Sequence, residues 1–243
     1  MDFGINGRRA AVGGASKGLG YGAAAALVAE GVRVAICGRD KAAVDAAATR
    51  LGPNAVGLVA DVSDSASGVA FVKAAAEALG GPIEILVANT GGPPPGTFKT
   101  TKPESYLPAI ELSLMSTVGM CQAAVPAMQA AKWGRVVAIT SISVRQPIAA
   151  LMLSNTARAG VTGFLKTLAR EIAADGVTVN SLQPGSHATD RIKQIYGGNL
   201  ADAGPMGDPA DFGSFVAFLC SEQAKFVTGA HIQVDGGAYA ALL

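Results

Sequence analysis

The chain has 243 residues, of which 50% are hydrophobic and 15% charged, and its formal net charge is +1. This length suffices for one sizeable core, and the near-neutral charge does not favour nucleic acid or an anionic membrane surface as a partner. The N-terminus lacks a basic segment followed by an apolar core, and no apolar run approaches the roughly 18 residues of a membrane helix. We therefore expect a soluble, cytoplasmic protein.

Cysteine and histidine are scarce. Cys37, Cys121 and Cys220 lie far apart without the paired spacing of a metal or redox site, so we expect buried free thiols. His187 and His231 are the two histidines, and this pair does not favour a metal site.

Strand and helix patterns alternate along the chain without a long polar linker, which predicts one domain over residues 1–243. Strands are expected at residues 10–12, 32–37, 55–62, 83–89, 135–140, 177–182 and 230–234. Helices are expected at residues 19–30, 41–51, 64–79, 103–128 (with a break near 112–113), 152–174 and 208–219. This alternation predicts a parallel sheet covered on both faces, and residues 183–207 read as a mobile loop with one short helix.

A glycine-rich turn joins the first strand to the first helix. Gly14, Gly18 and Gly20 allow the backbone to turn sharply and approach a diphosphate, for which the following helix supplies amide donors and a positive dipole. Three glycines alone are weak evidence, and the alternative is an ordinary strand-to-helix turn.

Five stretches in this order resemble the short-chain dehydrogenase/reductase family, in particular its 3-oxoacyl-carrier-protein reductase-like members, over essentially the whole chain. They are Gly13 to Gly20, Asp61-Val62, Asn89-Thr90-Gly91, Pro184-Gly185 with Thr189, and Val234 to Gly237. The resemblance implies an α/β fold of Rossmann type, a doubly wound parallel sheet of seven strands in the order 3-2-1-4-5-6-7 with helices on both faces. It also implies that residues 186–207 form the substrate loop. The cofactor-binding positions it implies are Gly14, Ser16, Lys17, Gly18, Leu19, Gly20, Asp61, Val62, Asn89, Gly91, Arg158, Pro184, Gly185 and Thr189.

The end of the second strand decides which dinucleotide is expected. An acidic residue there would bind the adenosine ribose and repel a 2′-phosphate, but the chain has Arg39. Arg39 can make a bidentate contact with a 2′-phosphate, and Lys17 adds a second positive charge. We therefore predict that the chain binds NADP (NADPH) in preference to NAD. The alternative for both cations is a solvated surface position, and Asp40 is assigned to capping the following helix.

The catalytic positions depart from the family pattern of Asn, Ser, Tyr and Lys. Counting from the matching motifs gives Ser113, Ser141, Ser154 and Arg158. Ser154 and Arg158 are four residues apart on one helix face, so the geometry of the family's Tyr–Lys pair is kept although both groups differ. An aliphatic hydroxyl is a far poorer acid than a phenol of pKa ~10, so both serines can orient a carbonyl without delivering its proton. The alternative for Ser154 is a hydroxyl bonded back to its own helix.

Three further residues are candidates for substrate contact. Arg145 follows Ser141 and could meet a carboxylate or phosphate, while His187 and Tyr196 lie where loops of relatives close over substrate. The alternative for each is a solvent-facing position.

Two functions remain open at this stage. One is an NADP-dependent oxidoreductase that interconverts a small-molecule carbonyl and an alcohol with an altered proton path. The other is an NADP-binding protein without turnover, serving as a sensor, scaffold or subunit. The resemblance also implies a homotetramer, built from the helices at residues 113–128 and 152–174 and from the C-terminal strand.

Overall fold

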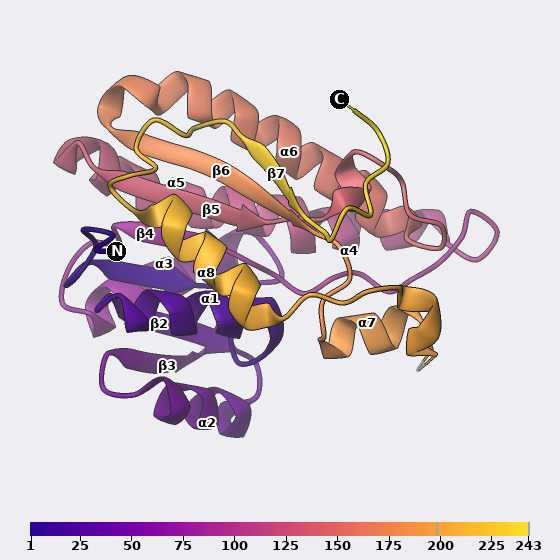
Figure 1. The fold of residues 1–243 in the computed structure, drawn as a ribbon, viewed down its shortest axis with the longest axis horizontal. Helices are drawn as coiled ribbons and strands as arrows, with labels where there is room; N and C mark the ends of the chain where they lie inside the picture. The colour runs from indigo at the N-terminus through magenta and orange to yellow at the C-terminus, as the bar shows by residue number, and fades with distance from the viewer. Residues whose placement is uncertain (198, 243) are drawn as a thin grey trace.

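The computed structural model describes residues 1–197 and 199–242. Seven parallel strands form one sheet in the order β3-β2-β1-β4-β5-β6-β7, which confirms the expected topology (Figure 1). Their bounds are β1 Arg9–Val12, β2 Arg33–Gly38, β3 Ala55–Val59, β4 Ile85–Ala88, β5 Gly134–Ile139, β6 Val177–Pro184 and β7 His231–Val234. Strand order reverses between β1 and β4, and a crevice at their carboxyl ends is the usual ligand site of such a sheet.

Helices cover both faces of the sheet. The long ones are α1 Gly18–Ala29, α2 Lys41–Leu51, α3 Ser65–Ala78, α5 Ser116–Ala131, α6 Met152–Ile172 and α8 Pro209–Cys220. Alternate strand residues point into two hydrophobic cores, one on each face of the sheet. One core lies under α1, α2 and α8, and the other under α3, α5 and α6. On β1, for example, Ala10 and Val12 face the first core and Ala11 the second, as the two-residue period of a strand requires. The short helix α7, Asp190–Ile195, lies beyond the carboxyl ends of the strands (Figure 1).

Local side-chain chemistry explains where several helices begin. The Asp40 carboxylate accepts a hydrogen bond from the Ala43 amide at 2.8 Å and so caps α2, as the sequence predicts. Asp64 and Ser67 form a reciprocal capping box at the start of α3.

The segment expected as one helix over residues 103–128 is divided. A 3₁₀ turn at Pro103–Ser105 leads into α4, Tyr106–Ile110, and a π-helical turn at Glu111–Met115 then precedes α5. The π turn contains the predicted break at residues 112–113, and Ser113 within it is buried. Wide turns of this kind are frequent at functional sites because they re-aim one side chain without ending the helix.

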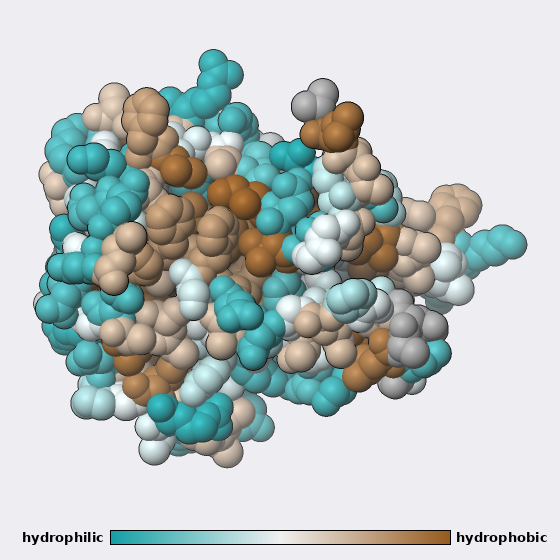
Figure 2. Space-filling view, viewed as in Figure 1, coloured by the Kyte–Doolittle hydropathy of each residue, from teal (hydrophilic) through white to brown (hydrophobic). Residues whose placement is uncertain are grey.

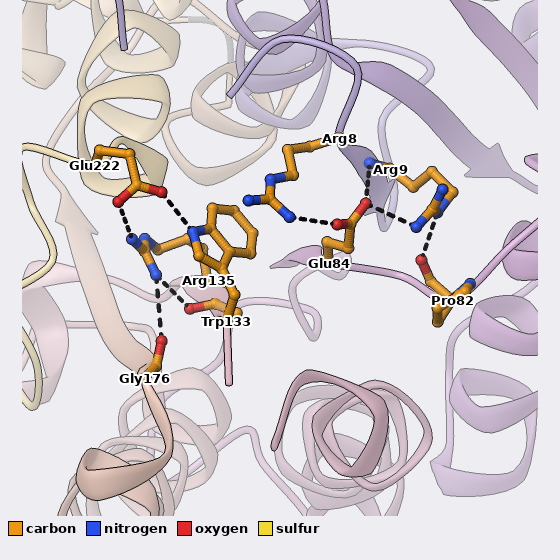
Figure 3. Close-up of polar contacts among 9 residues, drawn as sticks. Arg8, Arg9, Pro82, Glu84, Trp133, Arg135, Gly176 and Glu222 are labelled. Carbon is orange, nitrogen blue, oxygen red and sulfur yellow. Dashed lines mark hydrogen bonds and ion pairs between the residues drawn. The ribbon is translucent and has the colours of Figure 1, made fainter. Parts of the chain in front are cut away.

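The amino-terminal edge of the sheet, opposite the crevice, is held by a carboxylate. Glu84, just before β4, accepts hydrogen bonds from the Arg8 guanidinium at 2.6 Å and from the Arg9 amide at 3.1 Å, and it also pairs with the Arg9 side chain (Figure 3). The first and fourth strands are thereby fixed at their starts.

An indole lies next to this carboxylate cluster. Trp133 is stacked between two guanidiniums, with Arg8 3.8 Å and Arg135 4.4 Å from its ring centre, and its indole N–H donates to Glu222 (Figure 3). Arg135 is 1% exposed and donates to the carbonyls of Gly134, Gly176 and Ser221. Cation–π stacking, these three hydrogen bonds and an ion pair with Glu222 at 3.9 Å let this cation stay inside the fold.

None of the described helices combines the length and the hydropathy that a bilayer crossing requires.

Candidate active site

The glycine turn is held between two strands by its own backbone. The Gly13 amide donates to the Val87 carbonyl on β4 at 3.1 Å, and the Ala15 amide donates to the Cys37 carbonyl on β2 at 2.9 Å. Gly14 and Gly18 have φ of +54° and +61°, which favour glycine. A Cβ atom at Gly20 would lie 2.7 Å from the Gly14 carbonyl oxygen, so that position also requires glycine. The glycines therefore leave a hollow, the cradle, that side chains at these positions would occupy. Its position at the N-terminus of α1 fits a diphosphate.

Asn89, at the end of β4, shapes this turn. Its side-chain amide donates to the carbonyls of Gly13 at 2.9 Å and of Gly14 at 3.1 Å. The sequence predicts Asn89 as a ligand contact, whereas the structure places its side-chain amide on the turn itself. Asn89 therefore joins the two walls of the β1–β4 crevice.

The cations predicted for the 2′-phosphate differ in their surroundings. Arg39 is exposed at the end of β2, and no side chain among the described residues pairs with it. Lys17 instead forms an ion pair with Asp190 at 2.8 Å, and both side chains are largely exposed. Near the end of β3, Asp61 is exposed and Val62 is buried. The recognition edge predicted from the sequence is thus accessible at Arg39 and Asp61.

The predicted catalytic hydroxyls lie on three different elements. Ser141 follows β5 and caps a 3₁₀ turn, where its Oγ accepts a hydrogen bond from the Ser143 amide at 3.0 Å. Ser113 on the π turn has a buried Oγ without a partner among the described residues.

Ser154, in the first turn of α6, is buried, and its hydroxyl has no hydrogen bond within the described chain. Thr156 and Thr162 on the same helix do donate back to backbone carbonyls. The back-bonded alternative for Ser154 is therefore wrong, and its hydroxyl is available to another group.

Arg158 lies one turn beyond Ser154 on α6. Its guanidinium donates to the Ile139 carbonyl at the end of β5 at 3.0 Å and reaches the Gly91 carbonyl at 3.5 Å. Burial, and then the charge of Arg191, lower the pKa of Arg158 to about 10, so it remains a cation at neutral pH. The cation is thereby fixed where β5 ends.

The loop after β6 returns to the glycine turn. Pro184 ends β6, and the Gly185 amide donates to the Val234 carbonyl at 3.1 Å. The methyl group of Thr189 lies over Gly18, since a Cβ atom at Gly18 would lie 3.4 Å from it. The loop therefore carries Thr189 to the cradle, next to the Lys17–Asp190 ion pair.

Two of the three weaker substrate candidates are engaged elsewhere. His187 is 4% exposed, packs edge-on against Phe212 and contacts the Gly185 carbonyl, so the solvent-facing alternative is wrong for it. Arg145 is exposed and donates to the His231 carbonyl at 3.3 Å. Tyr196 is half-buried at the end of α7.

An open hollow of about 460 Å³ lies beside this site. Its lining includes Ser186 and His187 from the loop, Phe212 and Phe215 from α8, and Val234 from β7. None of the glycine-turn or catalytic-serine positions lines it.

Arg191 is a site residue that the sequence reasoning missed. It lies two residues beyond Thr189, and its guanidinium donates to the Pro93 carbonyl at 2.7 Å. Its position after Thr189 was the only signal available, because the contact joins residues 98 apart in the chain.

Comparison with known proteins now defines the family. A sequence profile described as enoyl-(acyl carrier protein) reductase matches residues 14–239. The 3-oxoacyl-(acyl-carrier-protein) reductases FabG of Vibrio cholerae and of Escherichia coli are each 34% identical to the chain, over 97% and 98% of it and 98% and 99% of their own lengths. The chain belongs to the short-chain dehydrogenase/reductase family.

Solved short-chain dehydrogenase/reductase structures superpose over the whole chain. The L-sorbose reductase of Gluconobacter frateurii, complexed with NADPH and L-sorbose, has a TM-score of 0.91 at 28% identity, with 100% of both chains covered. An NADPH-bound short-chain oxidoreductase of Pseudomonas aeruginosa, described as containing an atypical catalytic center, has a TM-score of 0.87 at 28% identity, with 96% of this chain and 97% of that one covered.

Proposed function

We propose that this short-chain dehydrogenase/reductase is an NADP(H)-dependent oxidoreductase that interconverts a small-molecule carbonyl and an alcohol. The observation that carries the proposal is the Arg158–Ile139 contact, which fixes a cation at the end of β5, immediately before Ser141. The L-sorbose reductase and the short-chain oxidoreductase to which the chain is similar are both described with NADPH bound, which supports the same assignment.

The residues around the crevice fit the dinucleotide. The amides of Gly14 to Gly20 would bind the diphosphate, and Arg39 the 2′-phosphate. Asp61 and Val62 would meet the adenine, and Pro184, Gly185 and Thr189 the nicotinamide amide. Arg158 would donate to the nicotinamide ribose. When bound, the reduced nicotinamide supplies a hydride.

The chain's own groups would stabilise the oxygen that gains charge. Ser141 and Ser154 donate hydrogen bonds to the substrate oxygen, and the nearby Arg158 cation favours the developing negative charge. No phenol occupies the Tyr position, so the proton would come from water, and the buried Ser113 hydroxyl, which has no partner among the described residues, would hold that water. Alignment of the reactants can lower the barrier by about 7–11 kcal/mol in favourable cases, so turnover does not require the missing acid.

The test is an NADPH-oxidation screen over ketones, aldehydes and 3-ketoacyl thioesters. Ser141→Ala and Ser154→Ala are each expected to lower kcat at least tenfold while NADPH affinity is retained. Ser214→Ala is the matched control, since this exposed hydroxyl on α8 donates only to the Ala210 carbonyl. NADPH binding without turnover on any carbonyl would favour the second candidate, a sensor, scaffold or subunit.

We also propose a homotetramer, in which residues 1–243 act as one domain and residues 186–207 as its substrate loop. β7 is an edge strand, and apolar residues gather over β7 and α8 on one face (Figure 2). On α8, Phe215 and Phe218 stack at 5.9 Å, and Phe226, in the segment between α8 and β7, is 98% exposed. Unpaired strand edges and apolar patches of this kind are covered in oligomers. Light scattering should give four chains, and a stable monomer would contradict the assembly.

A further inference from the structure

The start of α7 forms a bridge over the crevice between β1 and β4. Thr189 packs on Gly18, and Asp190 pairs with Lys17 at 2.8 Å, so two consecutive residues contact the glycine turn. Arg191, the next residue, reaches the opposite wall. Its guanidinium donates to the Pro93 carbonyl at 2.7 Å, and it covers Gly92 so closely that a Cβ atom there would lie 2.7 Å from its Cζ atom.

The charges at this bridge are unbalanced. Arg191 is half-buried, and burial lowers its pKa. Arg158 reaches the Gly91 carbonyl at 3.5 Å and Arg191 lies against the next residue, Gly92, so the two cations are close. The charge of Arg191 also lowers the pKa of Arg158. Neither has an ion pair with an acidic side chain anywhere in residues 1–197 and 199–242. Partly desolvated like charges without a counter-ion are costly in the free protein, and an anion between or beside them removes that cost.

The position of the bridge indicates which anion this is. Arg191 lies between the glycine turn, whose amides suit a diphosphate, and the loop that follows Asn89, whose amide is bonded to that same turn. An anionic group of a substrate would instead approach Ser141, which follows β5, and Ser154, which is on α6. The fixed fork of a guanidinium matches two phosphate oxygens at once.

We propose that Arg191 is a cofactor-binding residue whose guanidinium closes over the diphosphate of the bound dinucleotide, with residues 189–191 as a strap across the crevice. The inference rests on the proposed function. The strap contacts the glycine turn through Thr189. The ion pair between Asp190 of the strap and Lys17 is exposed and hence weak, so the strap can open to admit the dinucleotide.

The experiment measures binding by calorimetry with three probes. NADPH and 2′-phospho-ADP-ribose both contain the diphosphate, whereas adenosine 2′,5′-bisphosphate contains a single 5′-phosphate. Arg191→Gln should weaken the binding of NADPH and of 2′-phospho-ADP-ribose by the same factor, about tenfold or more. It should weaken the binding of adenosine 2′,5′-bisphosphate by less than about threefold. Arg191→Lys should recover part of the loss, because it restores the charge without the fork.

Lys193→Gln is the matched control. It removes a cation from the same helix, but this side chain is exposed and lies 3.6 Å from Asp190, so all three affinities should stay at the wild-type values. Hydrogen exchange gives a second readout: NADPH should slow exchange of the α7 amides in the wild type and much less in Arg191→Gln.

Three results would overturn the inference. The first is unchanged NADPH affinity in Arg191→Gln, which would make the Pro93 contact a structural tie only. The second is a loss confined to NADPH and absent with 2′-phospho-ADP-ribose, which would place Arg191 at the nicotinamide. The third is a rise only in the KM of the carbonyl substrate, which would make it a substrate contact. Failure of the wild type to bind NADPH at all would instead refute the proposed function.

Discussion

Replacing Asn89 with alanine tests whether the crevice depends on one side chain. The substitution removes the hydrogen bonds to Gly13 and Gly14, at 2.9 and 3.1 Å, and leaves both carbonyls without that donor. Each bond contributes about 1 kcal/mol net, so the free energy of unfolding should fall by about 2 kcal/mol. If NADPH binding must restore the turn, the same 2 kcal/mol corresponds to a loss of affinity of up to about thirtyfold.

The chain offers a matched control in Asn180, on β6. Its side-chain amide donates to the Val227 carbonyl at 2.7 Å and its Oδ1 accepts from the Ala230 amide at 3.1 Å, so Asn180→Ala also removes two hydrogen bonds. Both variants should lose similar stability in urea titrations, but only Asn89→Ala should lose NADPH affinity in calorimetry. Equal affinities for Asn89→Ala and the wild type, or an equal loss in the two variants, would refute this reasoning.

Three further predictions concern the rest of the fold. Arg135→Met should lower the free energy of unfolding by about 3 kcal/mol in denaturant titrations, because three carbonyls lose a charged donor. NADPH affinity should be unchanged, because Arg135 lies at the opposite end of the sheet from the crevice. An unaltered denaturation midpoint would contradict this prediction. Gly22→Ala should lower the free energy of unfolding by about 1–3 kcal/mol and weaken NADPH binding. A Cβ atom at this position would collide with the Pro209 carbonyl and displace α1 from α8. A variant with the wild-type melting temperature would count against this close helix packing. Burial, and then the nearby charges of Lys166 and Arg145, lower the pKa of His231 below its usual 6.5. As the pH falls, the unfolded chain therefore binds the proton before the folded chain does. The free energy of unfolding should decrease as the pH drops below about 6.5. His231→Gln should show a shallower fall between pH 7.5 and 5.5, and parallel curves would exclude His231 as the cause.

Much of the fold could be predicted from local patterns. The alternation of strand and helix patterns and the glycine turn after the first strand indicate a buried parallel sheet, and Asp40 marks the start of α2. These signals are short-range, so one sequence is enough to read them. The resemblance to a family then supplied the strand order, which no local pattern contains.

The crevice shows where sequence reasoning ends. Lys17 and Asp190 pair although 173 residues separate them, and Arg191 contacts Pro93 across 98 residues. Neither contact has a local signature, because both depend on how the loop after β6 returns to the sheet. The sequence predicts that Asn89 lies at this crevice, but it does not reveal that the side-chain amide is bonded to the glycine turn.

Calorimetric titration of the wild type and of Arg39→Ala with NADPH and with NADH measures whether the chain recognises the 2′-phosphate through Arg39. A charge-assisted contact to the 2′-phosphate is worth about 1.5–3 kcal/mol, so the wild type should bind NADPH about tenfold to a hundredfold more tightly than NADH. Arg39→Ala should lose that preference while its NADH affinity stays unchanged. Equal affinities of the wild type for the two dinucleotides, or no binding of either at millimolar concentration, would contradict the account.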